Sequence, residues 1–421
     1  MSEATLATTA AMNKDIKTLE TSQTFFQIVY SQFKEHTAAV FGAYTILFFI
    51  VIALMAPVIE YATGCDPDAQ NVFNRYKPPF SKVIAPQDVR ESAVQKFILE
   101  NPADATKIQQ ALMDKNLVHP LHPEDALYDW VNLEKSKAID SIQQIDTAKK
   151  ADLIKIASSF ESFHVFGTDE LGRDVLMRLI YGTRVSMGVG VLVALASAIV
   201  GLIIGALAGY YGGFIDTILM RVTDSLLSLP ILPVLVVIAA IDLKKVLGGL
   251  VNFTTSTFGS AAGGLAQDMV NNIFSGGKES VYKLVFILCL FSWMTVARLI
   301  RGSILSLRER EFILASKTLG ATDSTIIIRH MFPNVIAPLL VSVTLGVGDS
   351  ILFEAALSYL GLGIQPPMAS WGNMLFNAQE LIYQAPFLAI LPGILIFLVV
   401  VSFNFLGDGL QDAIDPKTVR R

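Results

Sequence analysis

Residues 311–334 have the sequence EFILASKTLGATDSTIIIRHMFPN, a charged stretch set between two long apolar runs. Phe312, Leu314 and Leu319 recur near helical spacing, and Ala315 fits the same stripe in place of Leu314. Charged side chains occupy the other faces, so the segment is expected to lie outside the hydrocarbon of a membrane. The pattern indicates a short amphipathic helix with an apolar stripe that is suited to packing against another molecule.

A turn and a second helix follow this first helix. Gly320 stands where the helix would end, because glycine adopts the left-handed conformation that terminates many helices. Thr322 or Asp323 is suited to cap a second helix, which we expect to run to Pro333. The stretch therefore predicts a helical hairpin, called here the hairpin, that is centred on Gly320.

The composition is that of a membrane protein. The 421 residues are 52% hydrophobic and only 16% charged, and the mean hydropathy is +0.53, which a soluble domain of this length would not show. The net charge is −5, and no basic tract is dense enough to form a nucleic-acid groove. The sequence predicts an all-α polytopic membrane protein that embeds in a lipid bilayer, with no nucleic acid among its partners.

Six apolar segments approach the length of about 20 residues that a membrane-spanning helix needs. The third is marginal in length, the fourth ends through Arg298, and the fifth contains Asp349 and Glu354. The six segments are residues 38–59, 186–211, 226–241, 282–300, 335–360 and 384–407.

Loop charges predict the orientation of these spans. The segment that holds the hairpin is rich in Lys and Arg, whereas residues 361–384 contain neither, so the hairpin is expected on the cytoplasmic side. With six spans in the inner membrane of a cell, residues 1–37 and 408–421 are then both expected on the cytoplasmic side. No removable signal peptide is indicated. A seventh span at 246–267 would place the basic hairpin on the extracytoplasmic side, so this uncharged segment is interpreted as an external loop or interfacial segment.

Between the first two spans lies a segment, residues 60–165, that is far longer than an ordinary loop. Helical periodicity with a charged face recurs in four stretches within it, and strand signals are nearly absent. It is expected to fold as a helical insertion on the extracytoplasmic surface. His119 and His122 form a pair, but without a third ligand they do not indicate a metal site. The four stretches are residues 91–99, 103–115, 123–131 and 134–158.

The hairpin resembles the cytoplasmic EAA loop of permeases from binding-protein-dependent ABC importers. Four further stretches are similar to the C-type permease subunit of dipeptide and oligopeptide importers, and together these matches run from residue 166 to near the end of the chain. The resemblance does not include residues 64–164. The four stretches are FGTDELGRDVLMRLIYGTRVS (166–186), GYYGG (209–213), ALSYLGLGIQPPMASWGNML (356–375) and LGDGLQDAIDPK (406–417).

The resemblance implies a type I ABC importer permease fold with a helical insertion between helices 1 and 2. Its implied partners are a second homologous permease subunit, two ATP-binding cassette ATPase subunits and an extracytoplasmic solute-binding protein. No cofactor is implied in this chain, and ATP–Mg belongs to the ATPase subunits. The residues implied to couple to the ATPases are Glu311, Phe312, Ala315, Leu319, Gly320, Ala321 and Asp323.

This chain departs from the family pattern within the hairpin. Leu314 stands where the family places the glutamate of its Glu-Ala-Ala motif. Glu311 lies one helical turn earlier and is positioned to supply the charge on nearly the same face. Docking is expected to persist, whereas the charge contact is altered. Lying flat on the membrane surface is the alternative for such a basic amphipathic helix.

Residues 168–180 are predicted to form an interfacial helix before the second span. Its apolar side chains fall on one side, which leaves Arg173, Asp174 and Arg178 available to water. The segment either simply sets the tilt of the second span or forms an outer gate with the partner permease, with Arg173 and Asp174 as gate residues.

Carboxylates at membrane depth commonly face a pathway, a cavity or a polar partner. Asp349 and Glu354 are five residues apart and thus about 140° apart around a helix, so they do not face one point. Glu354 is predicted to lie near the outer mouth, in the pathway or at a subunit contact, with hydrogen-bonded structure as the alternative. Asp224 is expected to form a local ion pair with Arg221, one turn earlier.

The chain lacks the motifs of an energy-supplying enzyme. Residues 276–279 read GGKE and do not form a phosphate-binding loop, and no nucleophile elbow is present. The function predicted is the permease subunit of an ABC importer for short peptides or a similar small solute, and not an enzyme. Two alternatives are a secondary transporter or channel that uses Asp349 and Glu354 as a relay, and a scaffold whose insertion is the functional part.

Overall fold

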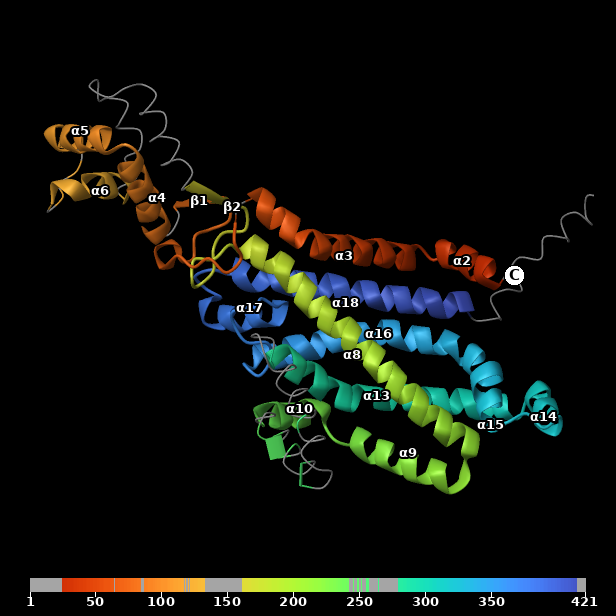
Figure 1. The fold of residues 1–421 in the computed structure, drawn as a ribbon. Coiled ribbons are helices and arrows are strands. Elements are labelled where there is room, and N and C mark those ends of the chain that lie inside the picture. Colours follow the sequence, from red (N-terminus) through yellow and green to blue (C-terminus); the bar gives the residue numbers. More distant parts are fainter. Residues whose placement is uncertain are drawn as a thin grey trace, which may run out of the picture. The chain divides into compact units, whose positions relative to one another are not determined.

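A computed structural model describes residues 25–63, 65–84, 87–116, 118, 120, 122–132, 161–241 and 279–414, together with 245, 248, 249, 251, 255, 256 and 264. The chain divides into two compact units. The core unit comprises Met1–Ile52, Thr183–Phe376 and Gly393–Arg421, and the insertion unit comprises Ala53–Gly182 and Asn377–Pro392. The hairpin and most of the apolar helices belong to the core unit (Figure 1).

Within the described residues, five helices are long and apolar enough to cross a membrane, and a bent pair of helices makes a sixth span if it is counted as one. The polytopic all-α fold class is therefore confirmed. Each of the five extends past its predicted segment at one end or both, because the helical hydrogen-bond ladder does not stop where the apolar run ends. The five helices are α3 (Thr37–Thr63), α8 (Val175–Tyr211), α13 (Glu279–Arg308), α16 (Phe332–Tyr359) and α18 (Phe387–Ile414).

The bent pair replaces the straight third span that the sequence predicts at 226–241. Helix α9 (Gly213–Leu227) and helix α10 (Ile231–Ala240) meet at an angle of 86°. The break is at Pro230, which has no N–H to donate and which disfavours helical geometry in the residue before it. A single apolar run therefore corresponds to only the second half of a broken span.

Helix α8 also differs from its prediction. No separate interfacial helix covers 168–180, because α8 begins at Val175 and continues unbroken to Tyr211. The preceding residues form a turn in which Thr168 and Asp174 are bridged. Gly172 has a positive φ of 73°, and a Cβ at this position would meet the Asn71 carbonyl oxygen at 1.8 Å. This close approach leaves no room for a side chain at position 172.

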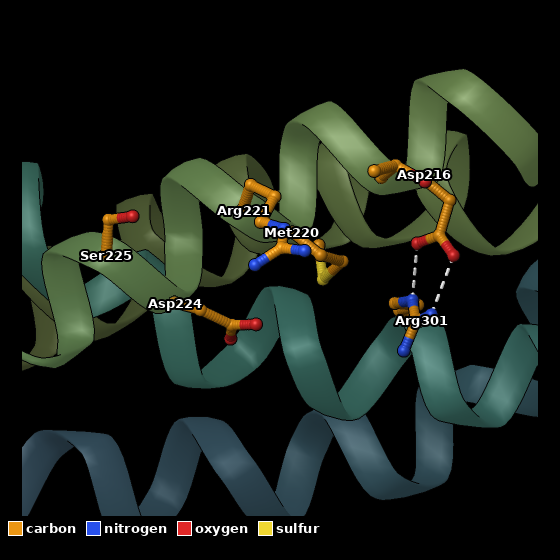
Figure 2. A pocket seen from close by; sticks show the side chains of 7 residues that line it. Asp216, Met220, Arg221, Asp224, Ser225 and Arg301 are labelled. Atoms are coloured by element: carbon orange, nitrogen blue, oxygen red, sulfur yellow. Dashed lines mark hydrogen bonds and ion pairs between the residues drawn. The ribbon is translucent and has the colours of Figure 1, made fainter.

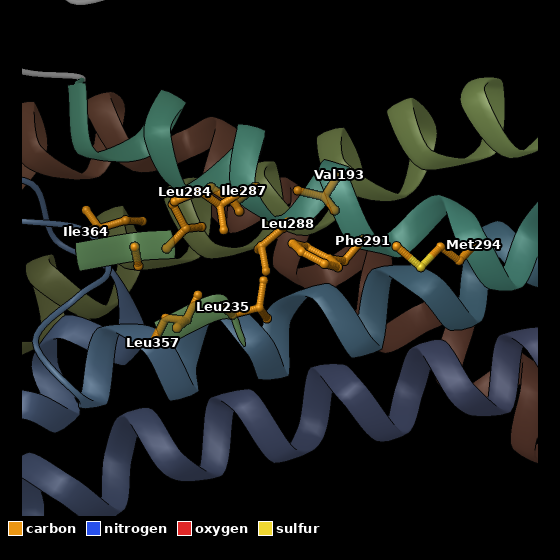
Figure 3. Close-up of a cluster of buried hydrophobic side chains, with 11 residues drawn as sticks. Val193, Leu235, Leu284, Ile287, Leu288, Phe291, Met294, Leu357 and Ile364 are labelled. Carbon is orange, nitrogen blue, oxygen red and sulfur yellow. The ribbon is translucent and has the colours of Figure 1, made fainter. Parts of the chain in front are cut away.

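The core unit is packed around α13. At Gly205 of α8, a Cβ would lie 2.5 Å from the carbonyl oxygen of Ala297 in α13, so the two backbones approach closely at this point. At the N-terminal half of α13, a cluster of buried apolar side chains joins α8, α10, α13 and α16 (Figure 3). Leu235 of the short helix α10 is fully buried in this cluster. The bent pair is therefore an integral part of the bundle.

The insertion unit has its own small core. Helices α4 (Gln87–Glu100), α5 (Pro102–Asp114) and α6 (Ala126–Asn132), with the 3-10 turn η2 (Pro123–Asp125), bury a cluster that includes Ile108, Leu112 and Leu127. These elements overlap the helices predicted at 91–99, 103–115 and 123–131. The helix predicted at 134–158 lies outside the described residues, as do His119 and most of 246–267.

A two-stranded sheet was not predicted for the insertion. Strand β1 (Ser81–Ile84) pairs antiparallel with β2 (Glu161–His164), so that Ser81 is opposite His164. Four-residue strands carry too little alternation to be recognised, and their partners are about 80 residues apart in the chain. A 3-10 turn, η1 (Val72–Asn74), lies nearby in the sequence. The remaining helices are α2 (Phe25–Glu35) and α17 (Trp371–Ala378), the latter followed by the 3-10 turn η5 (Gln379–Leu381).

Candidate functional site

The hairpin begins with helix α14 (Glu311–Thr318), which ends in the turn that the sequence predicts. Gly320 has a φ of +84°. The amide of Ala321 donates to the Ser316 carbonyl and the amide of Gly320 donates to the Lys317 carbonyl, both at 3.1 Å. This pair of bonds is the Schellman motif, which satisfies carbonyls left unpaired at a helix end. Only the left-handed backbone at Gly320 allows both bonds to form.

The second helix of the hairpin starts at a capped end. The Thr322 hydroxyl accepts a hydrogen bond from the Thr325 amide, so Thr322 is the cap of α15 (Asp323–Thr325). Asp323 instead accepts a 2.6 Å hydrogen bond from the Tyr210 hydroxyl, at the end of α8. Both residues were candidates for the cap, and the structure separates their roles.

The predicted end of the second helix at Pro333 is wrong. Helix α15 continues through a π-helical turn, η4 (Ile326–Met331), directly into α16. Pro333 falls in the first turn of α16, and the regular hydrogen-bond ladder is interrupted by the π turn instead of being ended by the proline. The hairpin is therefore an extension of the helix that carries Asp349 and Glu354.

One residue anchors α14 to the bundle. Ile313 is buried in a cluster with Ile304 of α13, Ile326 and Met331, whereas Phe312 and Leu314 on either side are exposed. Sequence reasoning missed Ile313, because three consecutive apolar residues fit more than one helical stripe. Its burial orients the neighbouring apolar side chains away from the bundle.

Most of the predicted coupling residues lie on the surface of the hairpin. Leu319, at 88% exposure, is the most open of its apolar side chains. Ala321 is the exception, because it is partly buried against the same cluster as Ile313. It is therefore less exposed than the other predicted coupling residues. The exposed residues among those predicted are Glu311, Phe312, Ala315, Leu319, Gly320 and Asp323. We call Phe312, Leu314 and Leu319 the hairpin face.

Two ion pairs join the bent pair to α13, and Figure 2 shows the one between Asp216 and Arg301. Arg301 holds Asp216 through two bonds of 2.5 and 2.6 Å, and Arg298 donates to Asp224 at 2.6 Å. The predicted pairing of Asp224 with Arg221 is therefore wrong. A cross-helix partner has the better geometry, which sequence spacing along one helix could not reveal. A cavity of about 400 Å³ lies between these groups, and Arg221 belongs to its lining.

Glu354 is fully buried inside a cage of hydroxyl groups. Ser358 donates to one carboxylate oxygen at 2.9 Å, and Ser186 of α8 donates to the other at 3.1 Å. Ser370 adds a further hydrogen bond. The Ser186 hydroxyl also accepts from the backbone amide of Trp371 at 3.1 Å. A buried carboxylate requires such partners, and these connect two long helices with the start of α17.

The same serines hold the loop between α16 and α17. The Ser358 hydroxyl accepts from the Ile364 amide at 3.3 Å, and the Asn373 side chain donates to the Ile364 carbonyl at 2.7 Å. The geometry of Glu354 thus corresponds to the hydrogen-bonded structural alternative, and it does not place this carboxylate on a pathway wall of the chain. Asp349, by contrast, is exposed and lines a separate cavity.

Arg173 and Asp174 are buried, which contradicts the prediction that water reaches them. Arg173 donates to Asp169 at 2.7 Å and to Glu170 at 2.9 Å, and Asp174 bonds to the ring of His164. Burial, together with the charge of Asp169, raises the pKa of the Glu170 carboxyl. Their role as gate residues stays a prediction.

Arg178 completes this charged cluster of the insertion unit. It is 1% exposed and lies 3.4 Å from a carboxylate oxygen of Asp169 and 3.6 Å from one of Asp68. Asn377 donates to Glu170 at 2.8 Å. The cluster joins segments that are far apart in the sequence, and the amphipathic pattern of 168–180 alone could not predict that these charges would be covered.

Comparisons with known families agree with this architecture. The family model described as "Binding-protein-dependent transport system inner membrane component" matches residues 201–420. The model described as "N-terminal TM domain of oligopeptide transport permease C" matches residues 24–79. Residues 80–200, which include most of the insertion, fall outside both ranges.

Individual relatives are permease proteins of bacterial transport systems. The dipeptide transport system permease protein DppC of Alkalihalophilus pseudofirmus is 38% identical over 254 residues, which are 60% of this chain and 72% of that protein. The glutathione transport system permease protein GsiD of Pectobacterium atrosepticum is 35% identical over 272 residues, 65% of this chain and 79% of the relative. The oligopeptide transport system permease protein OppC of Bacillus subtilis is 35% identical over 254 residues, 60% and 72% of the two chains.

The spanning helices, the hairpin and these matches lead to one conclusion. The fold supplies a bundle with an exposed hairpin, and the model that matches 201–420 includes that hairpin. The chain belongs to the family of binding-protein-dependent transport system inner membrane components, as a permease subunit of an ABC importer.

Proposed function

We propose that this permease forms half of a translocation pathway for short peptides or a similar small solute, and that a second homologous permease subunit forms the other half. The names of the relatives support the cargo class, since they refer to dipeptide, oligopeptide and glutathione transport. Selection among such cargoes is assigned to an extracytoplasmic solute-binding protein, which delivers the cargo to the permease pair.

The observation that carries the proposal is the hairpin. Its exposed apolar face is held outward by the buried Ile313, which is the arrangement expected of a helix that fills a groove on another protein. Two ATPase subunits bind ATP–Mg and dock on the two hairpins of the permease pair. Because the hairpin continues into α16, closure of the ATPases moves the pathway helix directly, and no chemical step is required of this chain.

Reconstitution tests this function. The tagged chain is purified from native membranes with its bound subunits and placed in vesicles. The radiolabelled dipeptide Ala-Phe and the solute-binding protein are added outside the vesicles. Uptake is expected only when ATP is enclosed with the ATPase subunits and hydrolysed. Uptake that a proton gradient drives without ATP, or a preparation that carries no nucleotide-binding subunit, would argue for a secondary transporter instead.

The orientation proposed is a cytoplasmic hairpin with both termini cytoplasmic, in the inner membrane. In a variant without Cys65 and Cys289, a cysteine at the exposed Ser324 should react with an impermeant maleimide in inverted vesicles and remain unreactive in intact cells. Tyr383→Cys, at a side chain that is 97% exposed, is the matched control and should show the reverse pattern. Labelling of the Ser324→Cys variant from outside would contradict the six-span topology.

A further inference from the structure

A cavity of about 550 Å³ lies inside the core unit, among α8, the bent pair, α13 and α16. This volume is in the range of small-molecule binding sites. Much of its wall is apolar, and Phe291, which also belongs to the buried cluster of Figure 3, forms part of it. The polar groups that bear on its chemistry are Ser197 of α8 and Asp349 of α16.

Asp349 is the one ionisable residue among those that line this cavity. Its side chain is exposed in the chain, and among the residues that the structure describes no hydrogen bond or ion pair is formed by its carboxylate. A carboxylate at membrane depth is costly unless a cation or a hydrogen-bond donor compensates it. Glu354, one and a half turns further along the same helix, has three serine partners. Asp349 is thus left to be compensated by something that enters the cavity.

Ser197 gives an independent indication. It is 2% exposed, and its hydroxyl has no hydrogen-bond partner in the described part of the chain. Two other serines of the same cavity behave differently, since Ser292 donates to the Leu288 carbonyl at 2.8 Å and Ser350 to the Gly346 carbonyl at 2.7 Å. Such bonding to the preceding turn is the usual solution for a serine in a helix. Ser197 is therefore a lining residue whose buried hydroxyl still lacks a partner, and a polar group of a bound ligand could supply one.

We propose that the cavity is a cargo subsite that binds a primary ammonium group attached to a small apolar body, as in the first residue of a short peptide. The Asp349 carboxylate accepts from the ammonium group, the Ser197 hydroxyl hydrogen-bonds a polar group of the same ligand, and the apolar side chain packs against Phe291 and Phe353. The subsite rests on the proposed function and adds to it a chemical class of ligand. A lipid tail or a helix of the partner permease would fill the volume, but an apolar group would not compensate Asp349.

Transport by the reconstituted complex gives the first test. Asp349→Asn should lower the maximal rate of ATP-driven Ala-Phe uptake by about tenfold or more, because a charge-assisted bond is replaced by a weaker neutral one. Asp349→Glu should retain most of the rate, and the half-saturating concentration of the solute-binding protein should not change. Thr344→Val, on the same helix and outside the cavity lining, is the control and should transport normally. Uptake by Asp349→Asn within twofold of the unmodified complex would overturn the inference.

Protection from labelling gives a readout that does not depend on transport. In the variant without Cys65 and Cys289, Ser342→Cys places a thiol on the cavity wall. Millimolar Ala-Phe should slow the reaction of this thiol with N-ethylmaleimide, either in the resting complex or during ATP turnover. N-acetyl-Ala-Phe, which has no ammonium group, should not slow the reaction. The substitution Asp349→Asn should abolish the protection by Ala-Phe. Equal protection by both peptides would contradict ammonium recognition. The absence of protection in both states would leave a lipid or the partner helix as the occupant and would overturn the subsite.

The two proposals fail in different ways. If a proton gradient drives uptake without ATP, or the preparation carries no nucleotide-binding subunit, the proposed function is wrong. If the unmodified complex transports Ala-Phe while Asp349→Asn matches it and Ser342→Cys is never protected, the function stands and only the subsite is wrong.

Discussion

Replacing Gly320 by valine is expected to leave an assembled permease whose uptake per ATP hydrolysed falls about tenfold. The φ of +84° at this position costs an ordinary residue about 1 to 2 kcal/mol, and a factor of 5 to 30 in population corresponds to that free energy. A Cβ at Gly320 would meet nothing within 4 Å, so the effect arises from the backbone and not from a clash. The turn lies outside the apolar part of both neighbouring spanning helices, so insertion into the membrane should be unaffected.

The measurement compares ATPase co-purification with the ratio of peptide uptake to ATP hydrolysis in reconstituted vesicles. Gly320→Asn is the matched control, because asparagine tolerates the left-handed region, and it should retain at least about half of the coupling ratio. A valine variant that transports at the unmodified rate per ATP would remove the hairpin from the coupling mechanism. If the asparagine and valine variants lose function equally, a partner subunit contacts the backbone at position 320 so closely that no side chain is tolerated there.

Replacing Glu354 by alanine is expected to lower the free energy of unfolding of the assembled complex by about 2 to 5 kcal/mol. The change leaves the hydroxyls of Ser186, Ser358 and Ser370 without their common acceptor, and each unpaired buried group costs about 1 to 3 kcal/mol, part of which rotation of the hydroxyls recovers. The serines that accept from the amides of Ile364 and Trp371 then lose the carboxylate that orients their hydroxyls, so the loop from Gly361 to α17 is held less firmly. Glu354→Gln keeps the shape and one acceptor oxygen, so it should lower the free energy of unfolding by less than Glu354→Ala does.

Thermal unfolding of the detergent-solubilised complex and hydrogen exchange over 361–376 measure these effects. Ser402→Ala is the control, because Ser402 is also buried but donates only to the Leu398 carbonyl in its own helix. Faster exchange confined to 361–376 in Glu354→Ala is the expected signature. An alanine variant that unfolds at the temperature of Ser402→Ala would show that the serine cage contributes nothing measurable to the fold.

Local chemistry was readable from the sequence wherever a residue type acts within one or two turns. The Gly320 turn and the Thr322 cap are of this kind, because their partners are backbone groups within five residues. The angular separation of Asp349 and Glu354 was predictable for the same reason, since it follows from helical periodicity. The apolar runs likewise identified every long helix, although not the break that Pro230 introduces into the third span.

What the sequence could not predict depends on partners that are remote in the chain. The acceptor of Ser186 lies 168 residues away at Glu354, and no spacing rule selects one serine among many. Arg173 and Arg178 carry the pattern of a solvated face, yet both are buried, with Asp169, Glu170 and Asp68 as their ion-pair partners. Asp224 found its partner on α13 instead of one turn away on its own helix. In each case, the decisive quantity is tertiary proximity.

The π turn η4 determines the rotational phase between α14 and α16. A π turn holds one residue more than an α turn, and each residue of an α-helix advances the chain by about 100°. Deleting one residue from 326–331 would therefore let the segment close as an α turn and leave the azimuth of the hairpin nearly unchanged, whereas deleting one residue from the regular part of α16 would rotate the hairpin by about 100°. A chimaera whose donor hairpin lacks the π turn would therefore keep the azimuth only if it also carries one residue fewer before Phe332.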